Sequence, residues 1–185
     1  MSSLFGGLQQ VFPSIIGSEY LGEDKVPGAT YNWQGFEVRH ESITEMSFQP
    51  ESLDFIAHLD VLEHVYDYRR ALKQAASVLK PEGGTMLCTV PFFMTRVDAL
   101  ELARPHADGS IEYFVAPEYH GDGLRPEGIL TWHHFGWELL QDAIDAGFSS
   151  ASIGIDYDPF CGFTTNNHPS ADYGLMYPLV FRAQR

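Results

Sequence analysis

The segment from residue 52 to residue 93 most restricts how this chain can fold. It reads as an apolar stretch (SLDFIAHLD), an amphipathic stretch (YRRALKQAASVLK), a Pro-x-Gly-Gly turn and a second apolar stretch (TMLCTVPFF). The amphipathic stretch, with Leu72 and Leu79 on one face, predicts a helix, and Asp67 stands where it can cap the start. The second apolar stretch predicts a strand covered on both faces. This order of elements predicts two parallel neighbouring strands joined by a helix.

The alternation of strands and helices continues on both sides of this segment. Further helices are predicted at residues 4–11 and 135–148, and Gly147 is placed to end the second one. Further strands are predicted at residues 14–20, 36–43, 150–158 and 177–184. We therefore predict one α/β domain over residues 1–185, built on a mainly parallel sheet with helices on both faces. Residues 94–130 interrupt this pattern as a long irregular insertion.

The composition excludes several classes of partner and site. The 185 residues include 25 acidic and 11 basic side chains, which gives a formal charge of −14, and the basic residues are scattered. Such a surface repels phosphate, so we expect neither nucleic acid nor an anionic membrane as a partner. The chain has two cysteines, no apolar run long enough to span a membrane and no basic start typical of a secretory signal. We therefore expect a cytoplasmic protein without a disulfide framework.

Acidic residues follow three of the predicted strands. Glu19, Glu41 and Asp60 each stand at or just after a strand end. Glu63 and His64 come shortly after Asp60. Because open α/β sheets bind ligands beyond the carboxyl ends of their strands, we expect these side chains at one binding edge. The alternative interpretation is that polar residues gather wherever strands end in water.

Residues 47–92 carry a family resemblance. Their strand, the VLEHV motif, the helix and the Lys-Pro-x-Gly-Gly turn resemble the central segment of class I S-adenosylmethionine-dependent methyltransferases, and more narrowly the subgroup that acts on small molecules. Residues 133–158 are similar to the late helix and sixth strand of that family. The resemblance implies a Rossmann-like, mainly parallel twisted sheet with an antiparallel last strand.

The resemblance also implies which residues bind the cofactor S-adenosylmethionine. Glu19, with Tyr20 beside it, would hold the two ribose hydroxyls, because a carboxylate offers two acceptors to a vicinal diol. Glu41 would meet the adenine amino group, with Ser42 and Ile43 alongside.

The end of the third predicted strand would lie at the reacting part of the cofactor. Asp60 and Val61 would stand beside the methionine part and the methyl acceptor. His64 is the candidate catalytic base, since a hydroxyl acceptor loses a proton on methylation. A structural histidine is the alternative interpretation of His64, and Glu63 is equally explained as an acid at a helix start.

The acidic Gly-rich loop that follows the first strand in this family has no match in residues 1–14. We therefore expect a fold truncated at the N-terminus, with the first strand missing. A second copy or partner chain that covers the gap, a sequence cut short upstream and a scaffold that no longer catalyses are the open explanations. The expected function is methyl transfer to a small-molecule or glycan-like acceptor, with S-adenosylhomocysteine as product. The alternative is a catalytically inactive methyltransferase-like module that binds a ligand or another chain.

The insertion contains residue types that bind divalent metals, namely His120, Asp122, His133 and His134. Their spacing matches no known metal motif, so we expect no metal site. A lid over the acceptor pocket is the role we predict for this segment, and its aromatic residues are explained by such a pocket or by ordinary core packing.

Overall fold

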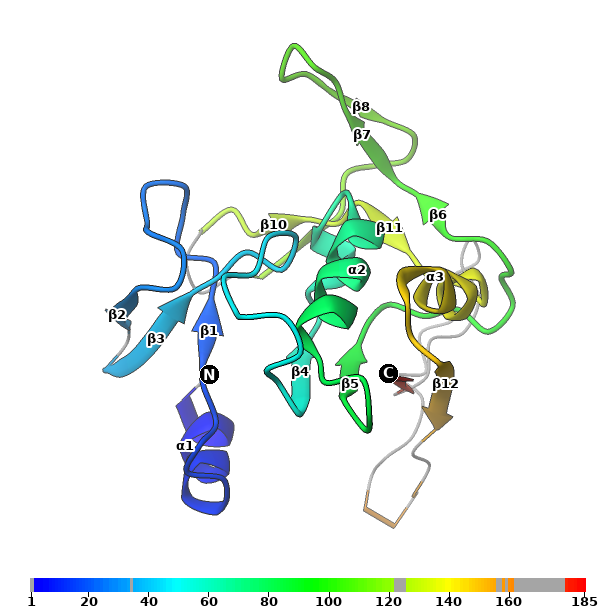
Figure 1. The fold of residues 1–185 in the computed structure, drawn as a ribbon. Coiled ribbons are helices and arrows are strands. Elements are labelled where there is room, and N and C mark those ends of the chain that lie inside the picture. The colour runs from blue at the N-terminus through cyan, green and yellow to red at the C-terminus, as the bar shows by residue number, and fades with distance from the viewer. Residues whose placement is uncertain (1, 34, 122–125, 156–157, 159, 162–178) are drawn as a thin grey trace.

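The chain folds as a mixed α/β structure, as predicted. The computed structural model describes residues 2–33, 35–121, 126–155, 158, 160–161 and 179–185. Its larger sheet has the strand order β12-β13-β5-β4 (Figure 1). These strands are β4 (Phe55–Leu59), β5 (Thr85–Thr89), β12 (Ser150–Ile155) and β13 (Leu179–Gln184). β4 and β5 are parallel, and the last strand, β13, is antiparallel to both β5 and β12, as expected.

A smaller sheet is formed by the N-terminal part of the chain. Its order is β1-β3-β2, with β1 (Ser18–Glu19), β2 (Thr30–Trp33) and β3 (Phe36–His40). β1 runs parallel to β3, whereas β2, which was not predicted, pairs antiparallel with β3. The helix α1 (Ser2–Val11) precedes them, and the ring of Phe5 packs edge-on against Phe36 with 6.1 Å between centroids.

The two sheets are not joined by hydrogen bonds, which corrects the prediction of one continuous sheet. Within the described ranges β1 pairs only with β3, and β4 pairs only with β5. Each sheet therefore ends in a strand edge that faces no described neighbour. On β4 the side chains of Phe55 and Leu59 are 51% and 59% exposed. Two separate sheets are what a missing first strand between β1 and β4 would leave. That the strand is missing stays a prediction.

Two helices cover one face of the larger sheet. They are α2 (Tyr68–Val78) and α3 (Glu138–Ala146), which contact each other. The predicted ends are confirmed: the amide of Arg70 donates to Oδ1 of Asp67 at 3.0 Å, and Gly147 closes α3 with a φ of 111°. The main core lies between these helices and the sheet and includes Leu72, Leu79, Met86, Cys88, Leu139, Phe148 and Phe181.

The prediction that β5 is covered on both faces is wrong for the described elements. Met86 and Cys88 are fully buried against the helices, but Leu87, between them, is only half-buried. β13 alternates in the same way, and its Val180 is 37% exposed. Both strands therefore bury one face, as a sheet with one helical layer does. None of the described helices is long and apolar enough to cross a membrane.

The insertion is more regular than predicted. It contains the pairs β7 (Ala103–Pro105) with β8 (Ile111–Tyr113) and β9 (Tyr119–His120) with β10 (Ile129–Leu130). β6 (Leu100–Glu101) pairs with β11 (His133–His134), which follows the insertion. In Figure 1 the β7–β8 hairpin projects from the body, and β10 and β11 lie on the side toward which the arrows of β1 and β5 point.

Candidate functional site

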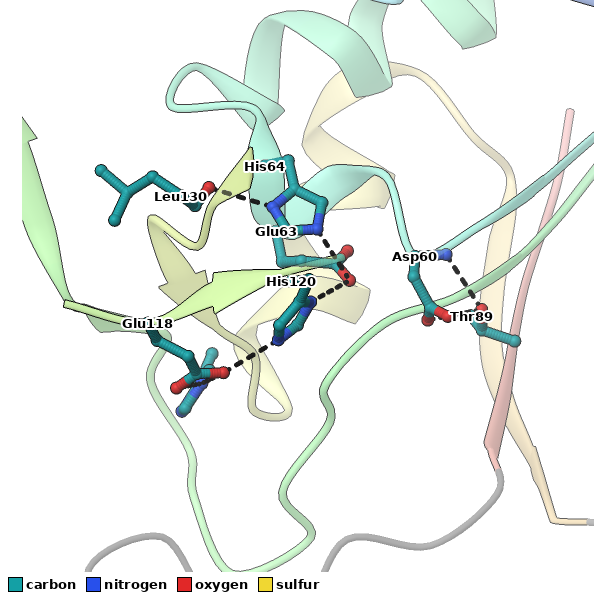
Figure 2. Close-up of polar contacts among 8 residues, drawn as sticks. Asp60, Glu63, His64, Thr89, Glu118, His120 and Leu130 are labelled. Carbon is teal, nitrogen blue, oxygen red and sulfur yellow. Dashed lines mark hydrogen bonds and ion pairs between the residues drawn. The ribbon is translucent and has the colours of Figure 1, made fainter. Parts of the chain in front are cut away.

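Asp60 occupies a sharp turn directly after β4. Its φ of 51° lies in the left-handed region, which Asp adopts more readily than most residues. The turn is fixed by Thr89 at the end of β5 (Figure 2). The Asp60 amide donates to the carbonyl oxygen and to Oγ1 of Thr89 at 3.2 and 3.1 Å, and this hydroxyl donates to Oδ1 of Asp60 at 2.8 Å. Val61 follows and starts the short 3-10 helix η1 (Leu62–His64).

Glu19 ends β1 on the same side of the molecule. β1 and β5 point the same way in Figure 1, and β4 is parallel to β5, so Glu19 and Asp60 both stand at carboxyl strand ends. The Glu19 carboxylate accepts a hydrogen bond from the amide of Tyr20 at 2.9 Å. The Tyr20 ring packs against His40 with 5.4 Å between centroids. The structure therefore keeps the predicted placement of these residues at one edge, while their cofactor contacts stay predictions.

Glu41 is engaged within its own loop. Its buried carboxylate accepts hydrogen bonds from Nε of Arg39 at 2.5 Å and from the amide and hydroxyl of Ser47 at 2.8 and 2.6 Å. Burial raises the pKa of Glu41, but these hydrogen bonds outweigh it and hold the pKa below its usual value. Ser42 bonds Thr44 through their hydroxyls at 3.0 Å, and Ile43 packs against the main core. Glu41 therefore holds its own loop together through Arg39 and Ser47, and its contact with adenine stays a prediction.

His64 lies close to a carboxyl group that is completely buried. Glu63 has no exposed surface, and burial raises the pKa of Glu63 to about 8, helped by the charges of Asp60 and Glu118. Nε2 of His64 is 3.9 Å from Oε1 of Glu63, and Nδ1 of His64 is 3.0 Å from the carbonyl oxygen of Leu130. The predicted base therefore belongs to η1 and contacts the insertion through Leu130.

Part of the insertion closes over η1. Nδ1 of His120 is 3.8 Å from the Glu63 carboxylate, and Nε2 of His120 is 3.0 Å from Glu118. Glu118 also contacts Nε2 of His134 at 3.0 Å. The role of this segment as a lid over the acceptor pocket stays a prediction. His133 points elsewhere and contacts the carbonyl oxygen of Tyr66 at 2.9 Å, and Asp122 lies outside the described residues.

The sequence placed Glu63 at the predicted binding edge but left open whether it is a helix-start acid. Its place inside the VLEHV motif next to His64 is the signal that it belongs to this group. Glu118 was not singled out, because nothing in the sequence pairs it with residues 55 positions earlier.

A surface depression of about 560 Å³ lies on another side of η1. Tyr66, Arg69, Glu101, Arg104 and His133 contribute to its lining. Neither Glu19 nor Asp60 borders it, so it is separate from the edge described above.

Comparison with known proteins finds similarity to methyltransferases over part of the chain. Residues 16–87, which contain β1 to β5 up to Leu87, match the family model described as a methyltransferase domain. Over these residues the chain is similar to the class I S-adenosylmethionine-dependent methyltransferases. The cofactor of that family is S-adenosylmethionine. The matched range contains all eight residues assigned above from the resemblance, namely Glu19, Tyr20, Glu41, Ser42, Ile43, Asp60, Val61 and His64.

Two relatives and one solved structure illustrate this similarity, the structure for the fold alone. A demethylmenaquinone methyltransferase of Bacillus pumilus is 26% identical over 80% of this chain and 61% of its own length. A ubiquinone biosynthesis O-methyltransferase of Cereibacter sphaeroides is 23% identical over 80% of this chain and 70% of its own length. A methyltransferase structure from Mesorhizobium loti shares the fold with a TM-score of 0.50 at 17% identity, covering 89% of this chain and 72% of that one. The match to the first of these relatives thus spans about three fifths of that protein's length.

Proposed function

We propose that this chain binds S-adenosylmethionine across the carboxyl ends of β1 and β4 and transfers its methyl group to a small-molecule acceptor. The observation that carries the proposal is the placement of Glu19 and Asp60 at strand ends on one side of the molecule, in a chain related to the methyltransferases. The two relatives named above act in quinone synthesis by their names, which favours an acceptor of the quinone class over a glycan.

Methyl transfer needs few catalytic groups once S-adenosylmethionine and the acceptor are both bound. S-adenosylmethionine supplies an already activated methyl group on a positively charged sulfur. The two oxygens of Glu19 suit a ribose diol, and each charge-assisted hydrogen bond contributes about 1.5–3 kcal/mol. The negative charge of Asp60 favours the cationic sulfonium. His120 and Leu130 contact η1, where they would help to exclude water from the reacting groups, and His64 stays the predicted acceptor of a proton from a hydroxyl.

Isothermal titration with S-adenosylmethionine and S-adenosylhomocysteine tests this proposal. We expect micromolar binding of both by the intact chain. Glu19→Ala should weaken binding at least tenfold, because it removes one or two charge-assisted hydrogen bonds. Glu37→Ala is the matched control, since Glu37 is an exposed acid on β3 of the same sheet. No binding at millimolar ligand would contradict the proposal and leave the inactive module; equal weakening by both variants would contradict the role of Glu19.

We also propose that an extended strand from a second copy or another chain pairs with the open edge of β4. The exposed side chains of Phe55 and Leu59 and the lack of a described neighbour on that side support it. Sedimentation of the purified chain tests whether a second copy pairs with β4. A species heavier than 20.8 kDa supports a second copy, and a monomer restricts the proposal to a strand from a different chain.

A further inference from the structure

Three side chains from two distant segments converge beside Asp60. Glu63 and His64 lie in η1, and His120 lies in β9, 56 residues after His64. One ligand atom of each residue lies within 4.8 Å of the other two. Figure 2 shows the two imidazole rings facing the same end of the Glu63 carboxylate. Their nearest nitrogens are 3.9 and 3.8 Å from its Oε1.

The carboxylate of Glu63 lacks the hydrogen bonds that burial requires. The side chain has no exposed surface, and neither oxygen accepts a hydrogen bond from another residue within the described part of the chain. A buried carboxylate without partners is costly, because it loses its hydration and gains nothing in return. Asp60 and Glu118 add negative charge nearby. Burial and these charges favour the protonated acid of Glu63 in the absence of a cation, and a cation bound beside Glu63 would take the place of that proton.

The hydrogen bonds of the two rings determine which nitrogens face Glu63. A carbonyl oxygen can only accept, so Nδ1 of His64, 3.0 Å from the Leu130 oxygen, donates its proton there. Nε2 of His120 likewise donates to the Glu118 carboxylate at 3.0 Å. In the neutral rings the other nitrogens, which face Glu63, carry lone pairs. Two lone pairs and a carboxylate oxygen thus meet at one point.

We propose that Glu63, His64 and His120 bind a divalent transition-metal cation such as Zn²⁺. Two imidazole nitrogens and one carboxylate oxygen are ligands that this class of ion prefers. Ligand atoms around such an ion at about 2.0–2.2 Å lie about 3–4 Å apart, so the three groups need to move by less than about 1 Å. Glu118 and the Leu130 carbonyl hold the rings as outer partners of metal-binding histidines do.

The cation would join the insertion to the edge of the larger sheet. η1 follows β4, whereas His120 belongs to the β9–β10 pair, so one ion links the segment that supplies the lid to the turn beside Asp60. This inference departs from our expectation that the chain has no metal site. It also changes the role of His64, because a nitrogen that holds a cation does not act as a base.

Metal binding by the full chain tests the inference without any methyl donor. The chain is dialysed against a chelator and then titrated with Zn²⁺ by calorimetry and with Co²⁺ by visible absorption. We expect one saturable site per chain, with an absorption band for Co²⁺ bound by nitrogen and oxygen. His120→Gln should weaken binding at least about a hundredfold, since it removes a ligand. His106→Gln is the control, because His106 is an exposed histidine of the insertion outside the site, and it should bind as the parent does.

A second variant keeps the test valid if the first one unfolds. Glu118→Gln retains the shape of an outer partner and should weaken Zn²⁺ binding about tenfold to a hundredfold. Circular dichroism and S-adenosylmethionine titration on the same samples separate loss of fold and loss of cofactor binding from loss of the metal site. Absence of a saturable site in the parent chain, or unchanged Zn²⁺ affinity in both variants, would overturn the inference and leave the proposed methyl transfer untouched.

Discussion

At the residue scale, the turn at Asp60 depends on a partner that the sequence did not reveal. The position of Asp60 at a strand end was predictable, because a run of apolar residues stops there. The partnership with Thr89 was not, because it requires the register of β4 against β5, in which Leu59 stands opposite Thr89. The left-handed φ of Asp60 is held by this one hydroxyl and the adjoining carbonyl.

Thr89→Val tests whether this turn matters for the cofactor. The substitution removes the hydroxyl that bonds both the amide and the carboxylate of Asp60, which costs about 0.5–1.5 kcal/mol for each bond lost. We expect S-adenosylmethionine to bind about tenfold more weakly, as measured by calorimetry. Thr85→Val, at the other end of β5, is the control and should leave affinity unchanged. Identical affinities for the two variants would show that the turn does not support the site.

His58 gives a prediction about pH. Both ring nitrogens are shielded from solvent, and burial lowers the pKa of His58 to about 4, against about 6.5 in the unfolded chain. Between pH 6.5 and pH 4 the unfolded state therefore binds more protons, so acid destabilises the fold. Relative to His58→Leu, the parent should lose about 2–3 kcal/mol of unfolding free energy between pH 7 and pH 4.5. Urea denaturation at both values measures this, and parallel losses in the two proteins would refute it.

At the element scale, the long elements followed from the sequence and the short ones did not. α2, α3, β4 and β5 have periodic apolar faces and clear start or stop residues, which local patterns reveal. The strands of the insertion have two or three residues each, and they exist because of distant partners such as β6 with β11. β2 was not predicted, because its pairing with β3 shows only in three dimensions.

The cap of α2 can be tested directly. Asp67→Ala removes the side-chain acceptor for the amide of Arg70, and losing such a cap costs about 0.5–2 kcal/mol of stability. Thermal or urea unfolding should show this loss, whereas Asp98→Ala, an exposed aspartate outside any helix, should leave stability within about 0.5 kcal/mol of the parent. A cap variant as stable as the control would mean that the 3.0 Å contact contributes nothing.

At the scale of the whole molecule, the described strands form two sheets that no backbone hydrogen bonds join, rather than one continuous sheet. The main core belongs to the larger sheet and its helices, and neither Val38 nor Phe5 of the N-terminal part is in it. The parallel neighbours and strand ends were predictable from the order of elements. A gap was also expected from the missing first strand, but whether the neighbouring strands would close it by pairing shows only in the structure.

The smaller sheet should therefore be the less stable part. We expect backbone amides of β3, such as that of Val38, to exchange hydrogen faster than those of Cys88 in β5 and Phe181 in β13. Native-state exchange followed by mass spectrometry measures this difference. Equal protection of β3 and β5 would show that both sheets open as one cooperative unit.

The same exchange experiment with added S-adenosylmethionine tests the central claim most directly, namely that the ends of β1 and β4 share one cofactor. The account predicts that saturating cofactor slows exchange both around Glu19 and around Asp60 to His64, while the β7–β8 hairpin is unaffected. Slower exchange at only one of these two strand ends, or at neither, would contradict it.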